Sequence, residues 1–205
     1  MFPPTTRNDA FVLTLRDEEN TRAIIEHLKI IIGSRKINDA HFFGLSFEMV
    51  TLGSDALDLC QISSLNFSPL NGEVIDFAYW TEKVRKWKVN DANLSGLPSY
   101  KESTEFLFKI SEIVQKLYFS LMNDELVPLW IVREILSRQV NDLTIYMHGK
   151  CLPYTEIEKL IQAFHRMDKK IHFSTWVEME NDAQIGMYKI FSSIVRGGAI
   201  DIIHM

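Results

Sequence analysis

His148 and Cys151 are the residues of this chain whose types and spacing could support nucleophilic catalysis. A cysteine acts as a nucleophile when a base lies within hydrogen-bond reach, and an imidazole three residues earlier could serve as that base. If the strand expected over residues 143–148 ends at His148, both side chains could lie in the loop above it. No third, orienting carboxylate can be identified, so the sequence favours a non-catalytic role for both residues.

Metal and phosphate chemistry have weaker support in the sequence. The chain has six histidines, and none stands at the short spacing from cysteines or carboxylates that zinc sites use. Gly197 and Gly198 fall between a helical pattern and a strand pattern, where glycine ends a helix, and they do not form a phosphate-binding fingerprint. We therefore expect no cofactor and no metal.

Aromatic and small polar residues occupy alternate positions of the later strands, and they are the candidate binding residues. These residues are Tyr118, Ser120, Tyr146, His148, His172, Ser174 and Trp176. Neighbouring strands lie about 4.8 Å apart, so the rings could form one strip, and exposed tyrosine and tryptophan are favoured at interface hot spots. The sequence predicts a protein-binding surface here; the alternative is that loops or a bulge bury the rings. Earlier strands would present smaller polar groups, with Lys88 and Asn90 in the third.

The strands that position these residues are predicted from a recurring frame, apolar-x-x-apolar-x-apolar. It occurs at Ile62-Leu65-Phe67, Val84-Trp87-Val89, Val114-Leu117-Phe119 and Val140-Leu143-Ile145. Degraded copies occur at Leu13-Leu15, Phe43-Leu45, Ile171-Phe173 and Ile200-Ile202. The copies follow one another at steps of 22 to 30 residues. Such a period indicates one strand-containing unit repeated about eight times.

Helical apolar spacing fills most of the gaps between these frames. Helices are predicted over residues 19–32, 73–84, 101–114, 127–139 and 154–166, and over Met187 to Ile194, where apolar residues recur at i, i+3, i+4 and i+7. The gap around Leu52 to Leu59 has room for one or two helical turns only.

Alternation within the strands decides which α/β architecture we expect. Leu143-Thr144-Ile145-Tyr146 and Leu65-Asn66-Phe67-Ser68 alternate apolar and polar residues, so one face is apolar and the other polar. Strands covered by helices on both faces are instead nearly continuously apolar. The pattern predicts a horseshoe solenoid of about eight parallel strands with all helices on the convex side, forming a single domain over residues 1–205.

This pattern resembles the leucine-rich repeat superfamily, in particular its ribonuclease-inhibitor-like branch of strand plus helix. The family motif is Leu-x-x-Leu-x-Leu-x-x-Asn/Cys-x-Leu, and the best match is Val84-x-x-Trp87-x-Val89-x-x-Ala92-x-Leu94. The chain departs from the motif at its asparagine or cysteine position, which holds Leu70, Ala92, Met122 and His148. A weaker similarity is to the irregular repeat regions behind F-box motifs in nematode substrate adaptors.

Composition excludes several partner classes. A net charge of -5 offers no general attraction for nucleic acid or an anionic membrane surface. No apolar run approaches the roughly 20 residues of a membrane span. Cys60 and Cys151 lie in different repeats, so free thiols in a reducing compartment, the cytoplasm or nucleus, are expected.

The last predicted strand, residues 199–205, would leave an apolar edge at Ile200, Ile202 and Ile203. Solenoids usually carry a polar terminal cap, and an apolar edge strand favours pairing. We expect a partner protein or a second copy of the chain to cover this edge, as a hetero-complex or homodimer. A truncated native protein is the competing explanation.

Together these observations predict a non-catalytic protein-interaction module or adaptor that binds a partner on its concave sheet face. One alternative is an enzyme on an open α/β sheet, with a site at the carboxyl ends of the strands where Asn123, His148 and Cys151 would matter. Another is an inhibitory or antidote-type binding protein.

Overall fold

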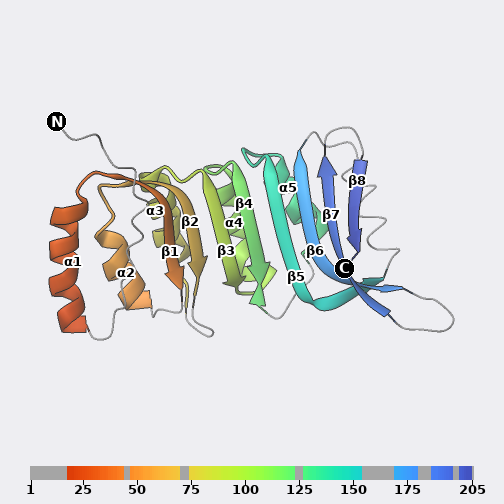
Figure 1. Cartoon of the computed structure of the whole chain (residues 1–205), viewed down its shortest axis with the longest axis horizontal. Coiled ribbons are helices and arrows are strands. Elements are labelled where there is room, and N and C mark those ends of the chain that lie inside the picture. Colours follow the sequence, from red (N-terminus) through yellow and green to blue (C-terminus); the bar gives the residue numbers. More distant parts are fainter. Residues whose placement is uncertain are drawn as a thin grey trace.

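A computed structural model describes residues 18–43, 47–69, 74–122, 127–153, 169–179, 186–195 and 199–204 (Figure 1). Its elements are α1 (Glu18–Ile32), β1 (Lys36–Phe43), α2 (Phe47–Asp55), β2 (Gln61–Ser68), α3 (Phe77–Trp87), β3 (Asp91–Leu97), α4 (Tyr100–Ser111), β4 (Lys116–Leu121), α5 (Leu129–Leu136), β5 (Asp142–Pro153), β6 (Lys170–Met179), β7 (Gly186–Val195) and β8 (Ala199–His204). The strand expected at Leu13-Leu15 and the helix expected over 154–166 lie outside the described residues.

The fold is α/β, with a parallel sheet of five strands, β1 to β5, that is not closed into a barrel. The strands stand in the sheet in the order in which they follow along the chain, and β6 continues the parallel pairing beside β5. Helices α3, α4 and α5 lie behind the strands on one face of the sheet, and each packs against the next (Figure 1). The other face of the parallel sheet is hereafter the open face.

Apolar residues at matching positions pair from strand to strand. Ala40 pairs with Leu65, Leu65 with Ala92, Ala92 with Leu117, Leu117 with Leu143 and Leu143 with Ile171. The steps between them are therefore 25, 27, 25, 26 and 28 residues, more regular than the steps read from the sequence. A regular strand spacing is thus observed from β1 to β6, and the frames at Ile62, Val114 and Val140 precede β2, β4 and β5 or begin within them.

The frame Val84-Trp87-Val89 was the wrong one for the third strand. Val84 and Trp87 belong to α3, which ends at Lys88 in the left-handed conformation (φ 57°, ψ 46°). The strand β3 begins four residues after Trp87, and the frame that matches its neighbours is Val89-x-x-Ala92-x-Leu94. The two frames overlap at Val89, which is why spacing alone did not separate them.

The helix predicted over Met187 to Ile194 is also wrong, since these residues lie in β7. β7 runs antiparallel to β6, and β8 antiparallel to β7, so the expectation of parallel strands throughout fails at this end of the sheet. Short apolar runs fit helix and strand spacing almost equally well. Tyr188, Ile190 and Phe191 are residue types that favour strands, and that preference agrees with the observed structure.

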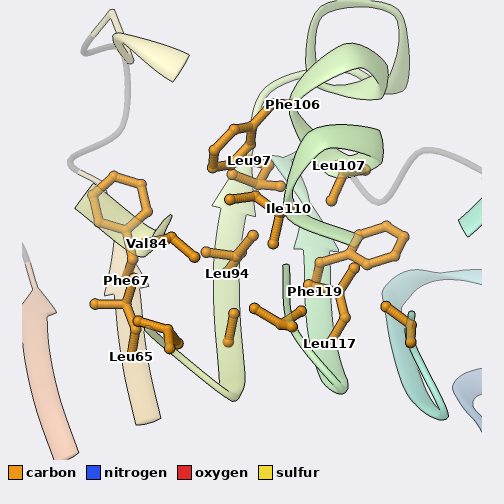
Figure 2. Packing of buried hydrophobic residues seen from close by; sticks show 14 of the residues in the cluster. Leu65, Phe67, Val84, Leu94, Leu97, Phe106, Leu107, Ile110, Leu117 and Phe119 are labelled. Atoms are coloured by element: carbon orange, nitrogen blue, oxygen red, sulfur yellow. The ribbon is translucent and has the colours of Figure 1, made fainter. Parts of the chain in front are cut away.

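The core lies between the sheet and the helices. Figure 2 shows Leu94, Leu117 and Phe119 of the strands pointing toward Leu107 and Ile110 of α4. All five side chains are at most 1% exposed. At the β1 side, the Phe67 and Trp80 rings lie 4.3 Å apart and join β2 to α3. Alternate strand residues are thus committed to the core, and the residues between them are left for the open face.

Candidate functional site

Three rows of side-chain positions cross the open face, because neighbouring strands are in register. The charged row holds Ser64, Asp91, Lys116, Asp142 and Lys170; the middle row holds Asn66, Asn93, Tyr118, Thr144 and His172; the outer row holds Ser120, Tyr146 and Ser174. Each row runs across the strands and takes at most one residue from each of β2 to β6. Along the strand direction, the open face therefore passes from a charged row to two rows of mostly small polar residues, which also hold Tyr118 and Tyr146.

Tyr118 and Tyr146 form an aromatic pair between the middle and outer rows. Their ring centroids lie 4.6 Å apart at an interplanar angle of 42°, and both side chains are half-buried. Burial, and then the neighbouring Tyr146 phenol, raise the pKa of Tyr118. Both effects favour the neutral phenol of Tyr118, and the pair offers apolar ring surface on the open face.

Of the other predicted binding residues, Ser120 is the best placed. It pairs in register with Tyr146, and its Oγ accepts a hydrogen bond of 3.0 Å from the Gly96 backbone N–H. His172 and Ser174 occupy the middle and outer rows on β6, where the backbone register sets them opposite Thr144 and Tyr146. Five of the seven predicted residues, namely Tyr118, Ser120, Tyr146, His172 and Ser174, thus come from one region of three adjacent strands.

His148 and Trp176 are separated from that region. The β5–β6 register shifts between Met147 and Cys151, and His148 falls within the shift. Trp176 pairs with Cys151 beyond it. β5 continues past His148 to Pro153, so the expectation that the strand ends at His148, on which the His148 and Cys151 pair depended, is wrong. Asn123 lies outside the described residues.

Ionic contacts follow the charged row. Lys116 Nζ lies 3.1 Å from Asp91 Oδ2, and the hydrogen bond to Asp91, its charge and the charge of Asp142 together raise the pKa of Lys116. Lys170 stands opposite Asp142 in the β5–β6 register. The signs therefore alternate from β3 to β6. A hollow of about 180 Å³ opens where the charged and middle rows meet, bounded by Asp91, Lys116 and Tyr118 among others.

Sequence reasoning missed Asn93, which lies in this hollow. Its Nδ2 donates a hydrogen bond of 2.9 Å to Asn66 Oδ1 on the next strand, and its buried Oδ1 accepts none from the described residues. The misplaced third frame put Lys88 and Asn90 on the open face instead. The frame beginning at Val89 was the signal that could have found Asn93.

A second polar network, also missed from the sequence, joins α2 to α3. Ser54 and Tyr79 form a short hydrogen bond, and Tyr79 also contacts Asp55. Lys83 Nζ lies 2.5 Å from a carboxylate oxygen of Asp55 and of Asp58, and 5.1 Å from the centroid of the Tyr79 ring. Lys83 is only 7% exposed.

Serine, tyrosine and lysine can perform acid and base chemistry, but this network is suited to structure. Ser54 is fully buried, and two carboxylates hold the Lys83 ammonium. Burial is the largest influence on Tyr79 and raises its pKa, which disfavours the phenolate that a base would need. The hollow on the open face is lined by other residues. We therefore assign the network to holding α2 against α3.

The C-terminal edge residues Ile200, Ile202 and Ile203 lie on β8, the last strand of the sheet. They pair with Ile194, Ser192 and Phe191 of β7. Among the described strands none pairs with the outer edge of β8. Within the described sheet β8 is therefore an edge strand, and β7 is its antiparallel neighbour.

Metal ligation and membrane insertion find no basis in the described part of the chain. Its histidine, cysteine and acidic residues form no group of three or more that could hold a metal ion. None of its helices combines the length and apolar character needed to cross a bilayer. Cys60 is buried and not disulfide-bonded; burial raises the pKa of its thiol.

Comparison with known proteins found no matching family model, no matching curated protein and no matching solved structure. The fold itself defines the class, an α/β protein whose open parallel sheet carries polar and aromatic residues on one face.

Proposed function

We propose that this chain is a non-catalytic protein-interaction module, a leucine-rich-repeat-like solenoid of about eight strands that binds a partner protein on its open face. The observation that carries the proposal is the half-buried Tyr118 and Tyr146 pair on the face away from helices α3 to α5. Tyrosine contributes large contact area with few rotatable bonds, which suits it to protein recognition.

Strand order favours binding over catalysis. Enzymes on open α/β sheets bind ligands where the strand order reverses, at the carboxyl ends of the strands. Strands β1 to β5 follow one another without a reversal. The hollow lies at the opposite ends of the strands, since Asp91, Lys116 and Asp142 are at or next to the strand starts.

Affinity capture from native cell extract tests this function. We would compare the wild-type chain with a Tyr118→Ser/Tyr146→Ser variant and with Trp130→Ala. Trp130 is the matched control, because it is an aromatic residue 56% exposed on α5, behind the sheet. A protein retained by wild type and Trp130→Ala but lost by the double variant supports the proposal.

Equal recovery with all three chains would contradict binding at the open face. It would move the interface to the helices or to the β8 edge, where Ile200, Ile202 and Ile203 lie. Light scattering then separates a homodimer through that edge, which doubles the mass, from a hetero-complex, in which the chain alone is monomeric.

A further inference from the structure

On β3 to β5 the charged residues of the open face lie beside opposite charges, while Asp39 of β1, in register with Ser64, adds an acidic residue at the far end of the row. Asp91 and Lys116 are paired at 3.1 Å, Asp142 acts on Lys116 from the other side, and Lys170 stands next in register. Positions two and four residues farther along these strands hold tyrosine, serine, threonine, asparagine and histidine. A charged partner group would gain little attraction here, and it would lose its hydration.

One hydrogen-bonding group beside the hollow has no partner among the described residues. Asn93 lines the hollow, and its buried Oδ1 is an acceptor that takes no hydrogen bond from them. Buried acceptors are almost always satisfied, so this oxygen favours a ligand or water that supplies an N–H or O–H group. The backbone N–H groups of an extended polypeptide are neutral donors of this kind.

Beside that acceptor, the Tyr118 and Tyr146 rings meet at 42° and present a ridge of apolar ring surface. Flat, rigid groups such as proline or aromatic side chains pack on tyrosine with little loss of conformational entropy. Aromatic-lined surfaces of other proteins bind proline-rich segments in this way. The rings of Tyr118 and Tyr146 and the neutral acceptor of Asn93 thus both suit an uncharged polypeptide segment.

We propose that the open face binds an extended, uncharged polypeptide segment that places a proline or aromatic ring on the Tyr118 and Tyr146 pair and donates a backbone N–H toward Asn93. The inference rests on the proposed function and narrows it to one class of partner. It commits the charged row to a structural role, in which it fixes the register of β3 to β6 and does not attract ligands.

A phage-displayed library of random dodecapeptides provides the probe. It would be selected in parallel on the wild-type chain, on Tyr118→Ser/Tyr146→Ser and on Trp130→Ala. We expect sequences rich in proline or aromatic residues and poor in charge, enriched at least about tenfold on wild type and Trp130→Ala and not on the double variant. Synthetic copies should bind with a Kd that changes less than about twofold between roughly 0.05 and 0.5 M salt.

Three results would overturn the inference. Enriched peptides that depend on the tyrosines but carry acidic or basic residues, with affinity falling more than about tenfold over the same salt range, would retain the interface and reject the neutral segment. Peptides that bind the double variant equally well would reject the open face itself, and with it the proposed function. Absence of any enrichment would reject peptide recognition, and capture of a folded protein partner would then decide the function separately.

Discussion

Lys83 has a structural role that the basic residues around it in the sequence do not indicate, because its ammonium group is buried against Asp55 and Asp58. Cations in the last turn of a helix complement the negative end of the helix dipole, and the run Lys83 to Lys88 holds four of them. Arg85 and Lys86 do lie in the last turn of α3. Lys83 instead turns inward onto Asp55 and Asp58, and burial opposes its charge, but the two carboxylates raise its pKa overall.

Lys83→Met should lower the free energy of unfolding by about 1 to 3 kcal/mol at pH 7, because methionine keeps the apolar contact but removes two charge-assisted hydrogen bonds. Urea unfolding followed by tryptophan fluorescence measures it. Lys86→Met is the control: Lys86 is 46% exposed and also pairs with Asp58, so its loss should cost less than about 1 kcal/mol. Equal effects of the two substitutions would contradict the assigned role.

The pH dependence of this stabilisation has a definite sign. Burial acts to raise the pKa of Asp58, but the hydrogen bonds from Lys83 and Lys86 lower it below 3.8 overall. A carboxyl group whose pKa is lower in the folded state stabilises the fold at pH values above its unfolded pKa. This stabilisation is lost as the pH falls through the folded-state pKa. Because the pKa of Lys83 is raised, its ammonium group stabilises the fold at pH values below the ordinary pKa of 10.5. This stabilisation is lost as the pH rises through the raised pKa. The difference in free energy of unfolding between wild type and Lys83→Met should therefore narrow below about pH 4 and above about pH 10.5.

At the scale of elements, the end of α3 decides the phase of the third repeat. Lys88 has a positive φ of 57°, a conformation that costs non-glycine residues about 1 kcal/mol or more. Lys88→Gly should therefore raise the free energy of unfolding by about 0.5 to 1 kcal/mol, and Lys88→Val should lower it. If residues 87–89 were a strand instead, glycine would destabilise and valine would not.

Neighbouring residues on one strand should respond differently to truncation. Leu117 is 1% exposed, so Leu117→Ala should cost about 2 to 5 kcal/mol by opening a cavity. Tyr118→Ser removes a half-buried ring on the opposite face and should cost less than about 1.5 kcal/mol. Thermal and urea unfolding would measure both; a larger cost for Tyr118→Ser would place that ring in the core and weaken its role in binding.

Elements were predictable where strand and helix patterns do not overlap. At least four residues lie between each of the strands that hold Leu65, Leu117 and Leu143 and the helix before it, and these strands were found. At Trp87 the apolar residues of a helix run into the next strand, and at β7 a strand imitates helical spacing. Pairing with neighbouring strands decides both cases, and a local pattern carries no information about pairing.

The site was predictable to the same extent. Tyr118, Ser120 and Tyr146 were assigned correctly to one face, since period-two alternation fixes the face once the strand is known. Asn93 was missed because its strand was shifted. The shift in register that separates His148 from Trp176 depends on irregular pairing of β5 with β6, which has no sequence signature.

At the scale of the whole molecule, the stacked repeats predict graded stability. In solenoids each unit is stabilised by its two neighbours. Strands β3 and β4 have a parallel neighbour on both sides, whereas none of the other described strands pairs with the outer edge of β1. Amide hydrogen exchange should therefore be slowest in β3 and β4, and β1 should exchange at least about tenfold faster. Equal protection of β1 and β4 would indicate a further pairing at the β1 edge.

The alternation along the strands also separates the residues that maintain the fold from the residues that face a partner, within one stretch of chain. Leu65, Ala92, Leu117 and Leu143 maintain the fold, and the charged row and the hydrogen bonds of Asn93 to Asn66 and of Gly96 to Ser120 support it from the open face. Mutational drift at Thr144, a half-buried residue of the middle row, would alter what is recognised at one spot and leave the core intact. Selection from a library of variants that differ only in the middle and outer rows could accordingly give this scaffold new binding specificities. Each repeat would contribute its own exchangeable positions.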